Sequence, residues 1–318
     1  MGSLVTGTGY IGIRLAQVLL DSGERVVALD NLFSTDLAAI EQLAKRPEFT
    51  FMEGDVRDED AVRRAFEAGT PIDTVYHLAA QASGNPAAAP MRYTEETNLV
   101  GPRVVLEQAC AGGVSTFVFG SSIQLYGRRM EGEIDENHPF GPILDMSHLS
   151  KVHAEKLMEM YSHNRGIRCV SARIGLVYGL SPVMKTDTRF MTAPNKFCRQ
   201  AARGETVRVD TSAFNPTSMV HVDDAARGMM GLATWPHEGF SAVNLLGETA
   251  SVADVARMVQ RLGASRGLDV RVEAPTSVGA IAQCEFRSAM GEIGFAPLRS
   301  LEEGLAEVLE YWVGEARP

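Results

Sequence analysis

The stretch Leu4-Val5-Thr6-Gly7-Thr8-Gly9-Tyr10-Ile11-Gly12 decides the fold. A short apolar run ends in a G-x-G-x-x-G motif, and apolar residues then recur at helical spacing as far as Ser22-Gly23. Glycines in such a loop let the backbone turn tightly and approach a diphosphate, and the following helix presents free N–H groups to it. The motif therefore predicts a dinucleotide site at Gly7, Gly9, Tyr10, Ile11 and Gly12.

Two acidic residues follow the next strand patterns. Asp30 comes 18 residues after Gly12 and closes the strand expected at 25–29. A carboxylate there can accept hydrogen bonds from both adenosine ribose hydroxyls and repels a 2′-phosphate, which predicts NAD rather than NADP. A glycine turn followed by a surface aspartate is the alternative, and the register of strand, glycines, helix and acid disfavours it. Asp55 is expected either at the adenine amino group or as a cap of the helix beginning near Asp58.

Strand and helix patterns alternate through the first half of the chain. This alternation predicts an α/β fold with a doubly wound parallel sheet that is covered by helices on both faces. Strands are expected at 4–6, 25–29, 49–52, 74–78, 116–119 and 168–172, and helices at 36–45, 58–68, 93–111 and 146–163.

The rhythm breaks after residue 173, where Pro182, Pro194 and Pro216 interrupt an irregular stretch. We expect a nucleotide-binding domain over 1–172 and a smaller α/β substrate lobe over 173–318. Some segments, about 218–245, are expected to return to the first lobe. Helices resume in the patterns at 223–232, 252–262 and 301–312.

The composition of the chain argues against several classes of binding partner. The 318 residues carry 40 acidic and 30 basic side chains, a net charge of −10, which argues against nucleic acid. No apolar run reaches the roughly 20 residues needed to span a bilayer, and no targeting segment is recognised. The four cysteines form no C-x-x-C pair and have no histidine cluster beside them. We therefore expect reduced thiols in a cytoplasmic protein, no metal site and no membrane partner.

Further motifs lie along the chain: Asp30-Asn31-Leu32, Gly54-Asp55-Val56-Arg57-Asp58, His77-Leu78-Ala79-Ala80-Gln81, Asn98, Gly120-Ser121-Ser122, Leu125-Tyr126-Gly127, Ser150-Lys151, Val177-Tyr178-Gly179, His221-Val222-Asp223-Asp224 and Ser300-Leu301-Glu302-Glu303-Gly304. Together with the glycine loop, this combination resembles the extended short-chain dehydrogenase/reductases, the NAD-dependent sugar-nucleotide epimerases and dehydratases. The resemblance implies a Rossmann-type sheet, NAD across the first lobe and a substrate cleft between the lobes. It also implies a homodimer built from long helices near 93–111 and 146–163.

The resemblance assigns roles to particular positions. Ser122 would orient the reacting oxygen, and Lys151 would hold the nicotinamide ribose and supply positive charge. Cofactor contacts would come from the glycine loop and from Asp30, Asn31, Asp55, Val56, Leu78, Ala79, Ala80, Gln81, Asn98, Ser121 and Lys151.

Several positions depart from the family pattern. The catalytic Tyr-x-x-x-Lys of the family places Ser147, not tyrosine, one helical turn before Lys151. Dehydratases carry an Asp-Glu pair where this chain has Ile123 and Gln124, which argues against elimination of water. Thr217 stands where sugar-nucleotide enzymes usually have an arginine that holds a phosphate.

The residues that would contact the substrate are therefore predicted from charge and position, because the family's phosphate-binding arginine is missing. The stretch 181–199 contains four basic residues and one acid, Asp187, and such an excess attracts an anionic, sugar-like substrate. A solvated or dimer-facing loop is the alternative interpretation. His148 beside Ser147 is a possible base, with a packing or surface role as the alternative. The candidate substrate contacts are Ser83, Gln124, Tyr178, Lys185, Arg189 and Lys196.

Two classes of function follow from these residues. In the first, the chain is an epimerase or dehydrogenase that transfers a hydride at a carbinol carbon of a sugar, a sugar nucleotide or a related anionic polyol. In the second, it binds NAD as a sensor or scaffold with lost or weak catalysis. Ser122 and Lys151 favour the enzyme, whereas Ser147 favours the alternative. A deliberate Tyr-to-Ser substitution in a sugar-nucleotide epimerase would also produce Ser147.

Asp30→Ala tests the cofactor prediction. We expect the variant to bind NAD more weakly, because two charge-assisted hydrogen bonds of at most about 1.5–3 kcal/mol each are lost. Calorimetric titration of the unmodified protein should also show NAD binding with little affinity for NADP. Equal affinity for the two cofactors would contradict the role given to Asp30.

Overall fold

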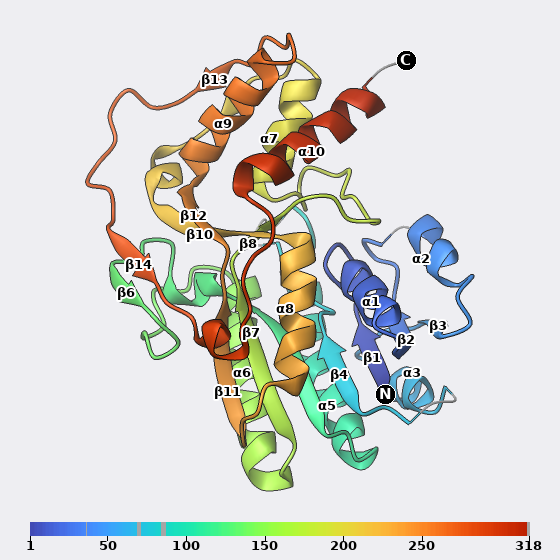
Figure 1. Ribbon diagram of the computed structural model, residues 1–318. Coiled ribbons are helices and arrows are strands. Elements are labelled where there is room, and N and C mark those ends of the chain that lie inside the picture. The colour runs from blue at the N-terminus through green and yellow to red at the C-terminus, as the bar shows by residue number, and fades with distance from the viewer. Residues whose placement is uncertain (36, 69–70, 84–86, 317–318) are drawn as a thin grey trace.

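A seven-stranded parallel sheet forms the centre of the first lobe (Figure 1) in the computed structural model, which describes residues 1–35, 37–68, 71–83 and 87–316. Its strand order is β11-β7-β5-β4-β1-β2-β3, which confirms the expected α/β, Rossmann-type architecture. The strands are β1 (Gly2–Thr6), β2 (Arg25–Asp30), β3 (Phe49–Glu53), β4 (Thr74–His77), β5 (Thr116–Ser122), β7 (Arg168–Ile174) and β11 (Phe240–Leu245).

Helices cover both faces of this sheet because each presents an apolar stripe to it. One face packs against α1 (Gly12–Asp21), α2 (Leu37–Leu43) and α8 (Val222–Thr234). The opposite face packs against α3 (Glu59–Phe66), α5 (Gly101–Ala111) and α6 (Met146–Arg165).

The site is positioned by the reversal of strand order at β1, which pairs with β2 on one side and β4 on the other. Connections leave the carboxyl ends of these strands toward opposite faces of the sheet. Such a switch point opens a crevice where α/β proteins bind ligands. The glycine motif, Asp30 and the segment after His77 all lie at this edge.

The helix predicted at 93–111 is interrupted. The chain runs as α4 (Met91–Glu95), a π-helical segment η1 (Glu96–Val100) and α5. Pro102 has no N–H to donate to the carbonyl of residue 98, so the α-helical hydrogen-bond pattern cannot pass through this point. The wider turn contains Asn98.

The second lobe contains α7 (Ala193–Ala202), α9 (Val252–Ala264) and α10 (Leu301–Glu315), which share a core with Phe197, Val259 and Trp312. Residues 193–202 were expected to be irregular, and the structure corrects this. Pro194 lies in the first turn, where a proline ring is compatible with a helix. Three small sheets complete this region: β8 (Leu176–Tyr178), β10 (Pro216–His221) and β12 (Glu248–Ser251); β9 (Val207–Arg208) and β13 (Val272–Glu273); β6 (Gly132–Ile134) and β14 (Cys284–Phe286).

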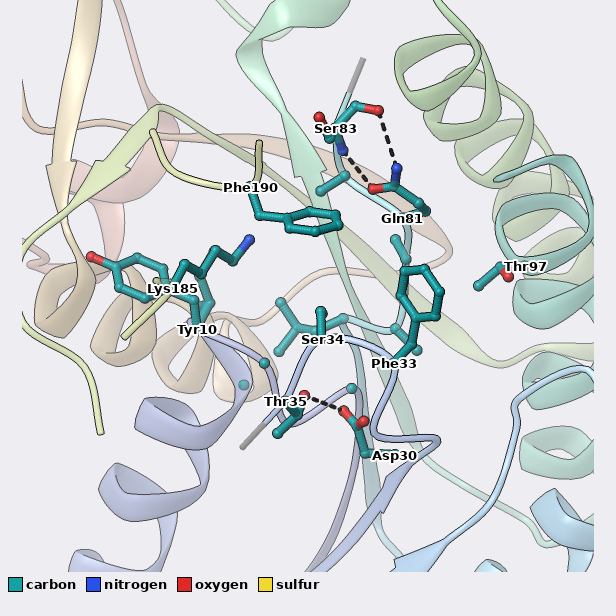
Figure 2. Close-up of a pocket in the computed structure, with 18 of the residues that line it drawn as sticks. Tyr10, Asp30, Phe33, Ser34, Thr35, Gln81, Ser83, Thr97, Lys185 and Phe190 are labelled. Carbon is teal, nitrogen blue, oxygen red and sulfur yellow. Dashed lines mark hydrogen bonds between the residues drawn. The ribbon is translucent and has the colours of Figure 1, made fainter. Parts of the chain in front are cut away.

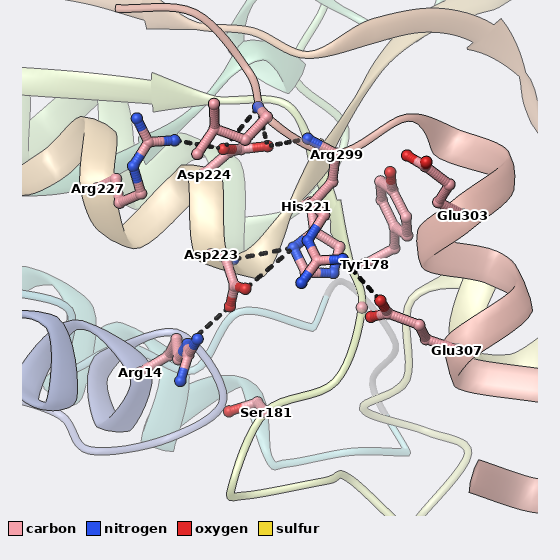
Figure 3. A network of polar contacts seen from close by, with 12 residues as sticks. Arg14, Tyr178, Ser181, His221, Asp223, Asp224, Arg227, Arg299, Glu303 and Glu307 are labelled. Atoms are coloured by element: carbon pink, nitrogen blue, oxygen red, sulfur yellow. Dashed lines mark hydrogen bonds and ion pairs between the residues drawn. The ribbon is translucent and has the colours of Figure 1, made fainter. Parts of the chain in front are cut away.

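The lobes are joined by a polar network around the start of α8 (Figure 3). Arg14 of α1 donates from Nε to Asp223 at 2.6 Å. Asp224, only 1% exposed, accepts the backbone N–H of Leu298 and the guanidinium of Arg227. Because Leu298 precedes α10, these carboxylates connect α1, α8 and α10. None of the helices in the described ranges is long and apolar enough to cross a bilayer.

Candidate active site

A cavity of about 470 Å³ occupies the switch point (Figure 2), a volume suited to a nucleotide-sized ligand. Its walls come from the glycine loop, the carboxyl ends of β2 and β4, and a segment of the second lobe. Fifteen of the residues expected from the sequence line it: Gly7, Gly9, Tyr10, Ile11, Gly12, Asp30, Asn31, Val56, Leu78, Ala79, Ala80, Gln81, Ser83, Lys185 and Arg189.

The glycine loop requires glycine at two of its three glycine positions. Gly7 has φ of +84°, and a Cβ there would lie 2.5 Å from the backbone nitrogen of Ala79. A Cβ on Gly12 would lie 1.8 Å from the carbonyl oxygen of Gly7. At Gly9 the nearest atom, a hydroxyl oxygen of Thr35, is 3.9 Å from such a Cβ, an ordinary van der Waals distance, and Gly9 lines the cavity. The cavity side of the loop is therefore free for a ligand.

The start of α1 supplies positive potential to that space. Its N-cap residue, Ile11, makes no side-chain capping bond. The first N–H groups of a helix have no intrahelical acceptors, and the helix dipole favours an anion beside them. A diphosphate lying against Gly9 and Ile11 meets both conditions.

Asp30 is 8% exposed and organises the loops around it. Its carboxylate accepts the N–H of Thr8 at 2.6 Å and the N–H of Leu32 at 2.7 Å. Leu32 has φ of 57°, a conformation uncommon for leucine, and this hydrogen bond supports it. Asp30 thus ties the glycine loop to the end of β2 while lining the cavity.

Asp55 does not line the cavity. Arg57 binds it through Nε and Nη2 at 2.8 and 2.7 Å, and Asn31 donates to it at 2.8 Å. Burial alone would raise the pKa of Asp55, but these hydrogen bonds hold it at about 2. The cap of α3 is Asp58, which accepts the N–H groups of Asp60 and Ala61. Asp55 therefore supports Asn31, and Val56 lines the cavity in its place.

Two residues predicted as cofactor contacts, Asn98 and Ser121, lie behind the cavity wall. The amide of Asn98 bonds the backbone of Gln81 in both directions and donates to Ser150. The hydroxyl of Ser121 donates to Glu155, which forms a buried ion pair with Arg173 at 2.7 Å. Both side chains hold neighbouring elements in place and do not line the cavity.

Lys151 and Ser122 both lie near the carboxyl end of β5, and neither they nor Ser147 lines the cavity. The Lys151 ammonium donates to the carbonyl of Gly120 at 2.6 Å, and Gly120 packs against the lining residue Leu78. Burial lowers the pKa of Lys151 to about 8, an effect that nearby Glu155 partly opposes. Ser122 accepts the N–H of Gln124 at 3.1 Å.

Ser147 lies on α6 one turn before Lys151 and is 2% exposed. Its hydroxyl donates to Asp145 at 2.6 Å. The ring nitrogen Nδ1 of His148 lies 2.8 Å from the same carboxylate and donates to it when Nδ1 carries the proton. Asp145 also caps α6 by accepting the His148 N–H. A carboxylate thus stands behind the position where the family has tyrosine.

Three predicted substrate contacts are absent from the cavity lining: Gln124, Tyr178 and Lys196. The ring of Tyr178 is 1% exposed in the second-lobe core, where it packs edge-on against His221, and its hydroxyl donates to the carbonyl of Ser300. These contacts give Tyr178 a structural role in the second lobe.

The sequence interpretation missed several lining residues. Phe33, Ser34 and Thr35 line the cavity directly after Asn31. Their position at the carboxyl end of a parallel strand was the available signal. Tyr93, whose ring stacks on Phe33 with centroids 4.4 Å apart, had no local signal, and neither had Phe190.

Residues 3–245 match the model of the NAD dependent epimerase/dehydratase family. The chain belongs to this family. It is 36% identical to a UDP-glucose 4-epimerase of Neisseria meningitidis over 159 residues, 49% of this chain and 46% of the relative. The alignment thus spans about half the length of that relative. A UDP-glucose 4-epimerase of Bacillus subtilis is 28% identical, with 96% of this chain and 95% of the relative aligned.

The fold agrees with solved structures. The crystal structure of a Thermus thermophilus UDP-glucose 4-epimerase in complex with NAD superposes with a TM-score of 0.82 at 27% identity, covering 99% of each chain. NAD is the cofactor of this family and of this chain. The residues described above fit it: the backbone of Gly9 at the cavity, uncapped N–H groups at Ile11 and the carboxylate of Asp30.

The lowered pKa of Lys151 predicts how the stability of the protein changes with pH. We expect the free energy of unfolding, measured relative to Lys151→Met, to rise between about pH 8 and 10.5. In this range the unfolded chain keeps a proton that the folded lysine, with its pKa lowered to about 8, has released. Raising the pH then favours the folded state by up to about 1.4 kcal/mol per unit. Urea unfolding of both proteins at pH 7.5, 8.5 and 9.5 measures this. A difference that does not vary with pH would show that Lys151 titrates as it does in water.

Proposed function

We propose that the chain is an NAD-dependent epimerase that inverts a carbinol carbon of an anionic sugar substrate. Family membership and the full-length similarity to the Bacillus epimerase support this proposal. The observation that carries it is Lys151, a desolvated ammonium at the end of β5 beside the wall of the nucleotide cavity. A buried charge is costly to maintain, and a positive charge at this strand end can stabilise negative charge that develops on the substrate oxygen.

NAD, when bound, supplies a reversible hydride acceptor for the carbinol carbon. Ser122 orients the reacting oxygen, because its hydroxyl stands two residues beyond Gly120, the residue that binds Lys151. Lys151 provides positive charge that stabilises negative charge developing on that oxygen. These side chains act on the substrate at the same strand end.

The hydroxyl proton needs an acceptor, and Ser147 is a weak one. Its hydroxyl donates to Asp145, so a proton received by Ser147 can be passed on to that carboxylate. Burial alone would raise the pKa of Asp145, but hydrogen bonds from Ser147 and His148 hold this pKa below its usual value. A carboxylate stabilised in this way binds a proton poorly, which makes the relay slow.

The substrate proposed first is a sugar nucleotide, because the named activity of both relatives is on UDP-glucose. Thr217 is 7% exposed and its hydroxyl has no hydrogen-bond partner within the described ranges. It cannot supply the charge of the arginine usual at that position. Sugar phosphates and uronates are therefore tested alongside UDP-hexoses.

Epimerisation and Ser147→Tyr together test the proposal. Purified protein incubated with UDP-glucose, UDP-galactose or UDP-glucuronate should interconvert the epimers, as measured by NMR. When the substrate carries deuterium at the carbon that is inverted, the deuterium should remain in the product. Ser147→Tyr should raise single-turnover NADH formation by about 10²–10⁴-fold, because a general base contributes about that factor.

Lys151→Met is the matched negative control and should remove the reaction. If Ser147→Tyr folds and binds NAD without any gain, the missing phenol is not the limitation. If no substrate forms NADH or an epimer with either protein, the epimerase proposal is wrong and the NAD-binding sensor or scaffold takes its place.

We also propose a homodimer formed through α4 and α6. Leu149 and Met160 are half exposed and lie eleven residues apart on α6, which places them on one face of the helix. Met91 on α4, which packs against α6, is 65% exposed. Large apolar side chains gathered on neighbouring helices are typical of protein interfaces.

Light scattering after gel filtration tests the dimer. Leu149→Glu should convert it to a monomer, because a carboxylate would be buried at the centre of the interface. Ile281→Glu, at an exposed apolar residue elsewhere, should leave the dimer intact. A monomeric unmodified protein would refute the proposal.

The proposed location is the cytoplasm, as expected from the sequence. The cysteines Cys110, Cys169, Cys198 and Cys284 are all unpaired, which suits a reducing compartment. Fractionation of cells expressing the protein would test this location, and recovery outside the cytoplasm would refute it.

A further inference from the structure

A segment of the second lobe, residues 179–190, crosses the nucleotide cavity; we call it the crossing segment. Its first end is fixed to the glycine loop. Tyr10 donates its hydroxyl to the carbonyl of Gly179 at 2.5 Å, and Ser181 donates to the carbonyl of Tyr10 at 2.6 Å. Asn195 holds the Tyr10 hydroxyl from the other side at 3.0 Å. The fourth residue of the glycine motif is therefore the attachment point.

The other end of the crossing segment is fixed beyond β4. Ser83 donates to the carbonyl of Arg189 at 3.1 Å, and the Arg189 guanidinium donates to the carbonyl of Ala87 at 2.8 Å. That guanidinium also pairs with Asp187 at 2.8 Å or less, so its charge is already balanced. The segment is attached to the first lobe on both sides of the cavity.

Lys185 lies between these attachments and points into the cavity beside Phe190 (Figure 2). Its ammonium is 6.0 Å from the Phe190 ring centroid, and no hydrogen bond or ion pair joins it to any residue the structure describes. Lys185 is partly buried, which lowers its pKa, and the nearby carboxylate of Asp187 is already paired with Arg189. A partly buried cation without a counter-ion is costly, so its presence indicates an anionic ligand.

The opposite wall is already arranged for the same anion. Gly9 lines the cavity without a side chain, and the start of α1 at Ile11 is uncapped. A ligand between these walls would meet neutral N–H donors on one side and a full positive charge on the other. Since Ser181 is bonded to Tyr10, the lysine four residues later is held over the same loop.

We propose that Lys185 binds a diphosphate in this cavity and that the diphosphate is thereby clamped between the glycine loop of the first lobe and the crossing segment of the second. The dinucleotide carries such a group, and so would a sugar-nucleotide substrate. The clamp rests on the NAD site and does not require epimerase activity. Binding would also hold the two lobes together, because Lys185 and the glycine loop belong to different lobes.

Calorimetric titration of Lys185→Met tests the clamp without any turnover. Loss of a charge-assisted contact should weaken binding of NAD and ADP-ribose about 10–100-fold. Adenosine, which has no phosphate, should bind as before. Lys185→Arg keeps the charge and should stay within a few-fold of the unmodified protein. Lys45→Met removes the same charge from the exposed end of the α2 region and should leave all three ligands unaffected.

A second titration, with UDP, identifies the source of the diphosphate. Weaker NAD and ADP-ribose binding with unchanged UDP binding assigns the clamp to the dinucleotide, and the reverse assigns it to the substrate. Unchanged binding of all these ligands to a folded Lys185→Met would overturn the proposal. If that variant does not fold, Lys185→Gln replaces it, with the thermal unfolding midpoint of each variant measured first.

Proton uptake gives an independent readout. Since burial lowers the pKa of the free lysine and a bound anion raises it, binding near that pKa should draw in a proton. Titrations in buffers of different ionisation enthalpy measure the uptake, which should be absent in Lys185→Met. The same uptake in both proteins would show that another group takes the proton, contrary to the proposal.

Discussion

The structure depends on a contact between two backbones that leaves no room for a side chain. Gly12 approaches the carbonyl of Gly7 so closely that a Cβ would overlap it, and Gly7 in turn lies against Ala79. This contact sets the direction in which α1 leaves β1 and keeps β4 beside it. The cavity, the free N–H groups at the start of α1 and the attachment of the second lobe through Tyr10 all follow from that geometry.

A second layer of polar groups fixes the walls without touching the ligand space. Asn98 holds Gln81 through two hydrogen bonds, and Asp55 accepts one from Asn31. Behind β5, the buried pair of Glu155 and Arg173 joins α6 to the sheet. Such satisfied networks are rigid, because leaving any member unpaired would be costly. They place Lys151 and Ser122 at one strand end.

Local signals explain what the sequence could predict. The strand alternation, the glycine loop and Asp30 are each specified by neighbouring residues, and all appear in the structure as expected. Features set by tertiary contacts were not predictable. Phe190 reaches the cavity because its segment crosses from another lobe, and Tyr178 turns away because the core of that lobe surrounds it. Pro194 suggested a break but begins a helix.

The π-helical turn at 96–100 affects the alignment of the helices on either side of it. Its wider loop of backbone takes up one more residue than an α-helical turn does, without rotating everything beyond it by about 100°. The stretch contains Thr97 at the cavity and Asn98 against Gln81. The apolar faces of α4 and α5 can thus keep their packing while Thr97 lines the cavity and Asn98 supports its wall.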